Sequence, residues 1–399
     1  MNKRAYAAEL FPGRVKMDIP SLLGSTPVGP FLRTAPEQEK FLPERVREHN
    51  KALVLRTLYH GGQQSRADLA RATSLARVTV GELVVELITS GIVRELGPRE
   101  AGRPGKPATL LDIDARSFVI VVVDLSQPGL FRGALVDLAG EIVGRADFAA
   151  PDLRGAMAVD AVISLVDDLV SRAEAPVLGV GIGSPGIVGD GGVRKATNLG
   201  WIDVDLAGIV ARRFGVATVL ANDADAAVLA ERRWGGASDN VILIRVGLGV
   251  GAGVIIDGRL VRGGRFTAGE IGHVVVGTDG GALCTCGKTG CLETWLSASS
   301  VRRQLADEAG ADAVRTAAGV RLGIALAPVV GILDVSEIVL SGPEDVLTEE
   351  VARIVGETIS DRAITAEYHH LDVRLTELGD DGVLRGAAAQ VLEARLGIV

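Results

Sequence analysis

Cysteine and aromatic residues are scarce in this chain. Its 399 residues include three Cys, three Trp and three Tyr, and aromatic side chains make up 4% of the total. So few thiols argue against a disulfide framework and fit a reducing cytoplasm. No uncharged apolar run reaches the roughly 18 residues needed to cross a bilayer, and the N-terminus has no apolar signal-peptide core. We therefore predict no membrane segment and a cytoplasmic location.

The three cysteines that are present lie within one eight-residue segment. Cys284, Cys286 and Cys291 follow His273, which stands eleven residues before the first of them. One imidazole and three thiols are a ligand set that zinc takes in tetrahedral structural sites, and two glycines between the thiols allow the tight turn that such a site needs. The sequence therefore predicts a structural Zn2+ ion here. The alternative is a trio of buried thiols with ordinary packing roles.

Two carboxylates flank this segment. Glu270 precedes His273 by three residues, and Glu293 follows Cys291 by two. A metal ion that pins the loop would present both carboxylates and the imidazole together. Carboxylates accept hydrogen bonds from vicinal sugar hydroxyls, and an imidazole with one nitrogen on the metal has the other fixed as a donor. The cluster favours a sugar site; the alternative is that both glutamates are solvated surface acids.

Charge is distributed unevenly along the chain. The formal net charge is -8, yet residues 40–110 carry 12 Lys and Arg against 7 Asp and Glu. A small cationic part attached to an acidic body indicates that only this part meets a polyanion such as DNA. The length of the chain points to two or three domains.

The cationic part has the periodicity of a helix-turn-helix. Residues 1–40 hold five prolines without a sustained period and are expected to form a flexible arm. Three helices are expected next, at 43–61, at 66–71 behind an N-capping Ser65, and at 76–90. Short strands at 92–96 and 108–113 flank a Gly/Pro-rich loop that is a candidate wing. Residues 41–113 are thus predicted to form a winged helix-turn-helix domain.

DNA contacts are expected from the third helix and from the wing. Ser74, Arg77 and Thr79 are the exposed positions that would enter the major groove, and Arg103 and Lys106 would face phosphates or a narrow minor groove. For any single basic residue the alternative is a solvated surface charge. Helix-turn-helix proteins usually bind paired half-sites, so we expect a homodimer or homotetramer on double-stranded operator DNA.

Beyond residue 115, apolar strands alternate with helices. Strands are expected at 118–125, 130–138, 141–148 and 177–182, with a helix at 158–173, and the pattern restarts at 240–245, 253–256 and 338–341. This pattern predicts an α/β body of two similar lobes with a cleft between them. The lobes are expected at 114–225 and 226–399, with the C-terminal helix returning to the first lobe.

Several motifs of the body resemble the ROK family of sugar kinases and sugar-responsive repressors. They are Cys-x-Cys-Gly-x-x-Gly-Cys-Leu-Glu at 284–293, Gly-Glu-Ile-Gly-His at 269–273, Ser-Pro-Gly at 184–186, Asn-Leu-Gly-Trp at 198–201 and Asn-Asp-Ala-Asp at 222–225. With a helix-turn-helix in front, the chain resembles the repressor branch, which includes the N-acetylglucosamine and xylose repressors. The resemblance implies a winged helix joined to an actin-like (ribonuclease H-like), two-lobed ATPase body.

The resemblance also implies roles for individual residues. The implied metal ligands are the four residues named above, and the implied sugar contacts are Asn198, Asn222, Asp223, Glu270, His273 and Glu293. In the kinases of the family, the aspartate that matches Asp223 is the base that deprotonates the sugar hydroxyl. Here Asp223 would be a base, only a hydrogen-bond acceptor, or a cap of the helix that starts near Ala224.

Two loops distinguish a kinase from a sensor, because phosphoryl transfer depends on positioning and charge neutralisation at the phosphates. The kinases of the family have Asp-x-Gly-Gly-Thr where this chain has Asp-Leu-Ser-Gln-Pro-Gly at 124–129. Gln127 adds bulk and Pro128 has no N–H to donate, so this loop should cradle phosphate poorly. The second loop, 247–253, keeps its glycines, which close packing of a strand and turn would also require.

The sequence thus predicts a sugar-responsive transcriptional regulator that represses carbohydrate-metabolism genes. Its effector is expected to bind between the lobes of a body that neither binds ATP nor has kinase activity. The alternative is an ATP-dependent, glucokinase-like sugar kinase with an added DNA-binding domain. A more remote interpretation is an interaction scaffold with a structural zinc ion and an empty cleft. The first two differ in whether ATP is turned over, and the third in whether any sugar binds.

Overall fold

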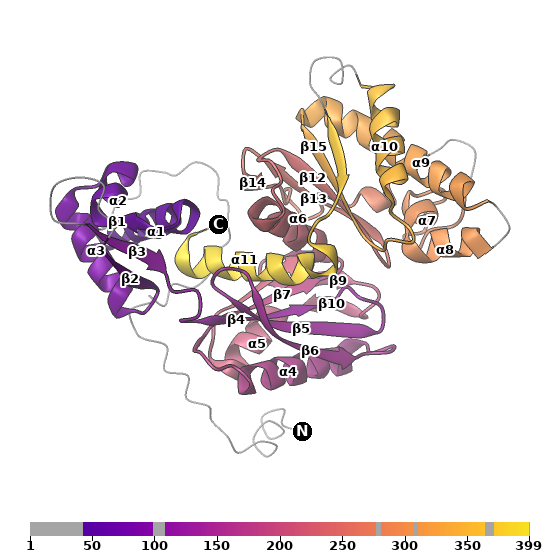
Figure 1. The fold of residues 1–399 in the computed structure, drawn as a ribbon. Helices are drawn as coiled ribbons and strands as arrows, with labels where there is room; N and C mark the ends of the chain where they lie inside the picture. The colour runs from indigo at the N-terminus through magenta and orange to yellow at the C-terminus, as the bar shows by residue number, and fades with distance from the viewer. Residues whose placement is uncertain (1–42, 99–107, 277–280, 307–309, 364–370, 399) are drawn as a thin grey trace, which may run out of the picture.

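The chain forms a helical N-terminal module followed by a two-lobed α/β body (Figure 1). The computed structural model describes residues 43–98, 108–276, 281–306, 310–363 and 371–398. The expected arm at 1–40 and most of the expected wing, with Arg103 and Lys106, lie outside the described residues.

The N-terminal module contains three helices and a small antiparallel sheet of order β1-β3-β2. Its elements are α1 (Pro43–Gly61), β1 (Gln64–Ser65), α2 (Arg66–Thr73), α3 (Arg77–Thr89), β2 (Val93–Pro98) and β3 (Thr109–Ile113). Ser65 caps α2 as expected, because its side chain accepts a hydrogen bond from the Asp68 N–H while the Asp68 carboxylate accepts one from the Ser65 N–H. α2 ends at Ser74, whose φ of 57° turns the chain toward α3. The expected helices and strands of this module are confirmed.

The first lobe is built on a five-stranded sheet of order β11-β7-β4-β5-β6. Its strands are β4 (Val119–Asp124), β5 (Leu130–Asp137), β6 (Ile142–Ala149), β7 (Val177–Ser184) and β11 (Thr218–Asn222). α4 (Gly155–Ser171) packs on one face and α11 (Gly382–Leu396) on the other (Figure 1). β4 and β7 are buried at every position, which explains why small and apolar residues fill both strands up to Asp124 at the end of β4 and Ser184 at the end of β7.

A smaller sheet and one further helix complete this lobe. The small sheet has the order β10-β9-β8. The elements are β8 (Ile187–Gly189), β9 (Gly192–Ala196), β10 (Trp201–Val204) and α5 (Leu206–Phe214). The Trp201 side chain is buried, and its indole N–H donates to the Gly155 carbonyl at the start of α4.

The second lobe repeats the topology of the first. Its sheet has the order β14-β13-β12-β15-β16, so the first strand in chain order is central, as β4 is. The two strand pairings on one side of it are antiparallel, and the two on the other side are parallel. The strands are β12 (Val241–Val246), β13 (Val250–Ile256), β14 (Arg259–Leu260), β15 (Glu337–Ser341) and β16 (Asp372–Leu375). The prediction of two similar lobes is confirmed.

Helices cover both faces of the second sheet. They are α6 (Asp223–Trp234), η1 (Ile271–His273), α7 (Glu293–Leu296), α8 (Ala298–Ala306), α9 (Ala311–Leu333) and α10 (Glu349–Ser360). A further short helix, η3 (Gly379–Asp381), precedes α11, and its Asp381 pairs with Arg132 and Arg145 of the first lobe. By length and composition alone, α9 could span a membrane, although it contains charged residues and no uncharged run of the sequence is long enough to do so. Its most apolar window is 44% buried, and α9 packs on α10 in the core of this lobe.

α6 and α11 form the junction between the lobes. The two helices cross so closely that a Cβ on Gly386 would lie 1.7 Å from the Ala226 carbonyl oxygen, so the crossing requires glycine. α6 also packs on β12 and β13. The lobe boundary expected after residue 225 therefore falls inside a helix that contacts both lobes.

The N-terminal module shares a hydrophobic core with the first lobe. Buried residues of all three module helices belong to the same cluster as those of β4, β5 and α11, including Leu58 and Leu396. The Arg56 guanidinium also donates to the carbonyl of Gly397, just after α11. The module is thus packed against the body instead of being tethered to it by a free linker.

The second glycine-rich loop is shorter than expected. The strand expected to begin at Gly253 begins at Val250 instead, because Val250 already pairs with Val246 across the turn. A Cβ on Gly253 would lie 2.3 Å from the Ala224 carbonyl oxygen in α6. Glycine is thus required at this position for packing, which supports the packing explanation of this loop.

Candidate ligand pocket and metal centre

A pocket lies between the lobes at the N-terminal end of α6. About 340 Å³ of space in and at the mouth of the pocket is free of protein atoms, and part of it is open solvent. Its lining residues are Gly186, Val188, Asn222, Asp225, Gly251, Ala252, Arg262, Phe266, Ala268, Gly269 and Glu270. Small residues on both lobes leave this space open beside two carboxylates, an amide and a guanidinium.

Asn222 fixes the wall of the pocket by capping α6. Its Oδ1 accepts hydrogen bonds from the N–H groups of Ala224 and Asp225, at 2.8 and 3.2 Å, and its Nδ2 donates to the Gly186 carbonyl at 2.9 Å. The alternative in which Asp223 caps the helix is therefore wrong, because Asn222 occupies the N-cap and Asp223 is the first helical residue.

Asp223 is held by an arginine that sequence reasoning missed. Arg245 Nε donates to Asp223 Oδ2 at 3.0 Å. Burial raises the pKa of Asp223, and the Arg245 charge opposes this rise. A signal for Arg245 was present, because it is the single charged residue in the otherwise apolar strand Val-Ile-Leu-Ile-Arg-Val.

Asp225 and Arg262 line the pocket although neither was assigned a role from the sequence. Burial raises the pKa of Asp225 to about 7, against the opposing charge of Arg262. Asp225 stands two residues after Asp223 within a motif already singled out. Arg262 and Phe266 belong to an irregular segment after β14, where no periodicity marks a functional position.

Glu270 connects the pocket to the metal-ligand cluster. Its carboxylate lines the pocket, and burial raises its pKa, with His273 opposing the rise. Glu270 Oε2 lies 3.9 Å from His273 Nε2, while His273 Nδ1 faces the sulfur of Cys284 at 3.5 Å. The two imidazole nitrogens thus point to the carboxylate and to the sulfur cluster respectively.

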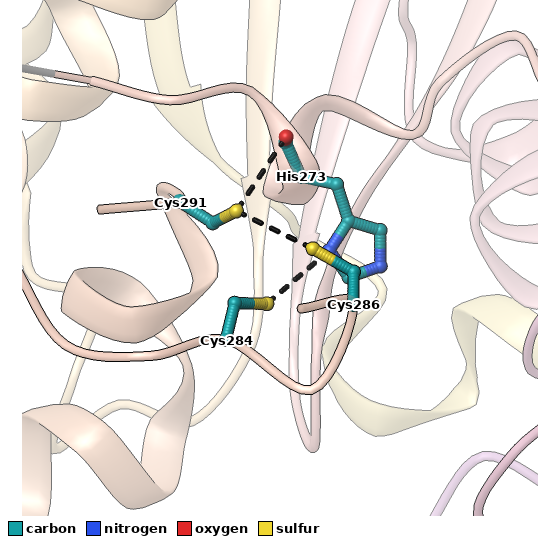
Figure 2. A group of neighbouring side chains, drawn as sticks. All are labelled: His273, Cys284, Cys286 and Cys291. Atoms are coloured by element: carbon teal, nitrogen blue, oxygen red, sulfur yellow. Dashed lines mark hydrogen bonds between the residues drawn. The ribbon is translucent and has the colours of Figure 1, made fainter. Parts of the chain in front are cut away.

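The four ligands predicted for a metal ion converge. Figure 2 shows His273, Cys284, Cys286 and Cys291 directed toward one another, and one ligand atom from each lies within 4.8 Å of all the others. Such a group is able to hold a metal ion. The turn between the thiols uses positive φ at Gly287 and Gly290, of 88° and 79°, as expected for a tight glycine turn.

The remaining predicted sugar contacts lie at different places. Glu293 begins α7, and its Oε1 lies 3.7 Å from the Cys284 sulfur, so it borders the metal-ligand cluster. Asn198 lies in the turn between β9 and β10. Asn198, Asp223, His273 and Glu293 are not among the residues that line the pocket in the described part of the chain.

Three of the residues predicted to face DNA lie in the turn before α3 and in its first turn. Ser74 and Arg77 are exposed and Thr79 is half-buried. Val78, which sequence reasoning did not single out, is 74% exposed. An exposed valine at the beginning of a helix is marked by no sequence pattern, because its exposure depends on how α3 packs on α1 and α2.

Two sheets of the same strand order, joined through α6 and with a pocket between them, define an actin-like, two-lobed α/β body. The chain belongs to the ROK family, whose model matches residues 129–394. The xylose repressor of Caldicellulosiruptor bescii is 29% identical over 394 residues, covering 88% of this chain and 97% of the repressor.

Two solved structures share the fold. The crystal structure of a ROK family transcriptional regulator, a homolog of the Escherichia coli Mlc protein, has a TM-score of 0.78 at 23% identity and covers 88% of this chain and 98% of its own. A ROK family glucokinase from Streptomyces griseus, in complex with glucose and AMPPNP, has a TM-score of 0.59 at 27% identity and covers 68% and 98%.

Proposed function

We propose that this protein is a sugar-responsive DNA-binding repressor in which a kinase-like body senses the effector. The observation that carries the proposal is the extent of similarity. The xylose repressor and the ROK regulator each cover 88% of the chain, whereas the glucokinase covers 68%. Residues 114–399 alone are too few for the larger coverage, so the two regulators also match part of the helical module.

In this proposal residues 41–113 are a winged helix-turn-helix domain, and α3 enters the major groove. Arg77 and Val78 at its start present a guanidinium and an apolar side chain to solvent. These groups are suited to the edge of guanine and the methyl group of thymine. Ser74 and Thr79 would add hydroxyl contacts, and Arg103 and Lys106 would reach phosphates from the wing.

The pocket between residues 114–225 and 226–399 is proposed as the effector site. Asp225 and Glu270 supply acceptors for sugar hydroxyls, and Arg262 supplies donors. Phe266 offers a ring face to the C–H side of a sugar. Partial closure of the lobes would bring further contacts to the ligand, from Asn198, Asp223, His273 and Glu293.

Zinc is the metal that we propose for the His/Cys cluster. A tetrahedral ion with Zn–S distances of about 2.3 Å and Zn–N distances of about 2.0–2.1 Å separates two sulfurs by about 3.8 Å and a sulfur from a nitrogen by about 3.6 Å. The matching distances are 3.6 Å between the sulfurs of Cys286 and Cys291 and 3.5 Å between Cys284 Sγ and His273 Nδ1. The residues fit zinc, which would pin the segment that carries Glu270.

A sugar kinase is the competing proposal, because the body aligns with a glucokinase that binds AMPPNP. The first loop argues against it. The Asp124 Oδ1 atom accepts hydrogen bonds from both the N–H and the hydroxyl of Ser126, so the loop is folded back on itself. Pro128 has no N–H to offer a phosphate. A coupled ADP assay with glucose, xylose and N-acetylglucosamine tests this proposal, and sustained turnover would establish the kinase.

α6 offers a direct path from the pocket to the DNA-binding module. Its first turn carries Asp225 at the pocket, and its last turn carries Arg233, whose guanidinium carbon lies 4.3 Å from the centre of the Tyr59 ring in α1. The Tyr59 hydroxyl donates to the Leu138 carbonyl of the first lobe. We propose that closure around a sugar moves α6, and that α1 follows within a cytoplasmic homodimer or homotetramer.

A thermal-shift screen tests the effector site. The protein, loaded with zinc, is heated with hexoses, pentoses, amino sugars and their phosphates, with and without Mg-ATP. Specific binding raises the melting temperature by mass action. We expect a shift from one sugar that Mg-ATP does not enlarge. A protein that responds to none of them fits the scaffold interpretation, and a response that requires Mg-ATP supports the kinase.

A selection from genomic fragments tests the DNA-binding half of the proposal. Fragments retained by the protein are sequenced, and binding is repeated with the sugar that shifts the melting temperature. Arg77→Ala is the matched control, because it should reduce specific retention and leave the thermal shift unchanged. A chain that retains no specific fragment, with or without sugar, contradicts the repressor assignment.

A further inference from the structure

Arg245 is a buried cation placed between the two lobes. It lies in β12, the central strand of the second sheet, and is 9% exposed. A guanidinium so far removed from water requires charged or polar partners to offset its desolvation. Those partners identify what the residue does.

The partners come from the first lobe and from the start of α6. Arg245 Nε donates to Asp223 Oδ2 at 3.0 Å, and Arg245 Nη2 donates to Ser126 Oγ at 2.6 Å. The Ser126 hydroxyl in turn donates to Asp124 Oδ1 at 2.6 Å. One polar chain, Asp124–Ser126–Arg245–Asp223, therefore ties the end of β4 to α6 and to β12.

Two members of this polar chain, Asp124 and Ser126, belong to the loop that matches the phosphate-binding loop of the family's kinases. Phosphoryl transfer requires a divalent cation beside the phosphates. Here the guanidinium donates to Asp223 directly and reaches Asp124 through Ser126, and a second cation beside it would be repelled. One Asp124 oxygen is engaged by Ser126, and the other has no hydrogen-bond partner. Mg-ATP therefore does not fit the residues that are present.

We propose that Arg245 takes the place of the divalent cation: it orients Asp223 as a ligand acceptor and joins the lobes, so that sugar binding needs neither metal nor nucleotide in this region. Arg245 engages Oδ2 of Asp223, which leaves Oδ1 for a sugar hydroxyl. Asp223 also raises the pKa of Glu270 in the pocket wall, which places the two carboxylates within electrostatic reach. The inference rests on the proposed sugar-binding function and names a positioning residue for it.

The first test compares Arg245→Met and Arg245→Lys with the wild type by isothermal titration of D-xylose, D-glucose and N-acetylglucosamine at several pH values. Without the guanidinium, Asp223 holds its proton to higher pH and loses its fixed orientation. We expect Arg245→Met to bind the responding sugar roughly ten- to a hundredfold more weakly near pH 7 and to recover part of the loss at higher pH. Arg245→Lys should lie between the two.

A surface variant provides the control for these titrations. Arg212 forms an ion pair with Asp205 on the surface, and both side chains are largely exposed. Arg212→Met should leave affinity and its pH dependence unchanged. Equal affinity and equal pH profiles for Arg245→Met and the wild type would overturn the proposal while leaving the sugar-sensing function intact.

A second test does not depend on the sugar. Titration with Mg-ATP alone should show no binding to the wild type, and saturable binding would overturn the replacement of the divalent cation. Arg245→Met leaves the Asp223 carboxylate without its counter-charge, which raises the pKa of Asp223 further, so the melting temperature of the variant should fall more steeply with rising pH than that of the wild type. Adding Asp223→Asn should remove the extra steepness. If no sugar binds the wild type, the proposed function fails, and these two measurements still decide the role of Arg245.

Discussion

Loss of the proposed zinc ion should weaken effector binding, because the ion would hold the segment that carries Glu270. Cys286 is exposed, whereas Cys284 and Cys291 are buried. Cys286→Ser therefore removes one ligand with little change in packing. Glu270 lines the pocket and lies three residues before His273. Without a metal ion its carboxylate is no longer held at the pocket wall.

The size of the effect follows from the entropy of loop closure. The proposed metal ion would join His273 to Cys284, eleven residues later. Closing a loop of this length restricts the open chain by about 3 kcal/mol. Only the part of this free energy that orders Glu270 affects the affinity for the effector. We expect the affinity for the effector to fall about ten- to a hundredfold, which corresponds to about 1.4–2.8 kcal/mol.

Zinc content by atomic emission and sugar affinity by isothermal titration measure the two effects on the same preparation. Cys286→Ser should contain little zinc and bind the responding sugar weakly, and chelator-treated wild type should behave in the same way. Lys288→Ala is the matched control, since Lys288 is an exposed non-ligand in the same turn. A zinc-free variant that binds the sugar as tightly as the wild type would refute the proposed pinning.

Three further changes test other parts of the molecule. Arg77→Ala should weaken specific operator binding by about 1 to 3 kcal/mol in fluorescence anisotropy, and unchanged affinity would exclude Arg77 from base contact. Arg233→Ala removes the contact with Tyr59 and should reduce the effect of sugar on operator affinity by about 0.5 to 2 kcal/mol, whereas an unaltered response would argue against a path through α6. Burial raises the pKa of Asp225 to about 7, so Asp225 should lower the stability of the wild type as the pH rises from about 4 to 7. The melting temperature of Asp225→Asn should therefore fall less over this range. A fall as steep as that of the wild type would show that Asp225 is not the cause.

Much of the fold was predictable because its signals are local. The strand expected at 118–125 appears as β4 (Val119–Asp124), and the third helix expected at 76–90 appears as α3 (Arg77–Thr89). Burial on both faces selects continuous apolar residues, and burial of one stripe selects a helical period. Ser65 was predictable as a helix cap because a capping box depends on only four consecutive residues.

The pocket was less predictable because its walls come from segments far apart in the sequence. Glu270 and Asn222 belong to recognisable sequence motifs. Arg262 and Phe266 line the pocket only because of the path that the chain takes after β14. Arg245 was visible as a charge in an apolar strand, yet its partners across the lobe boundary were not. Periodicity reports burial and says little about which polar groups meet.

The position of α6 explains how a kinase-like body is suited to sensing. The helix begins at the pocket with Asn222 bonded to the Gly186 carbonyl of the first lobe, and it is locked to α11 at Gly386. α11 shares a core with the N-terminal module, so α6, α11 and the module should move together. An effector shifts this assembly only through contacts whose strength differs between open and closed lobes. Contacts that bridge the lobes, such as those of Arg245 and Glu270, are therefore expected to contribute most to the change in lobe closure on sugar binding. Contacts to one lobe alone would add affinity for the sugar without changing the closure.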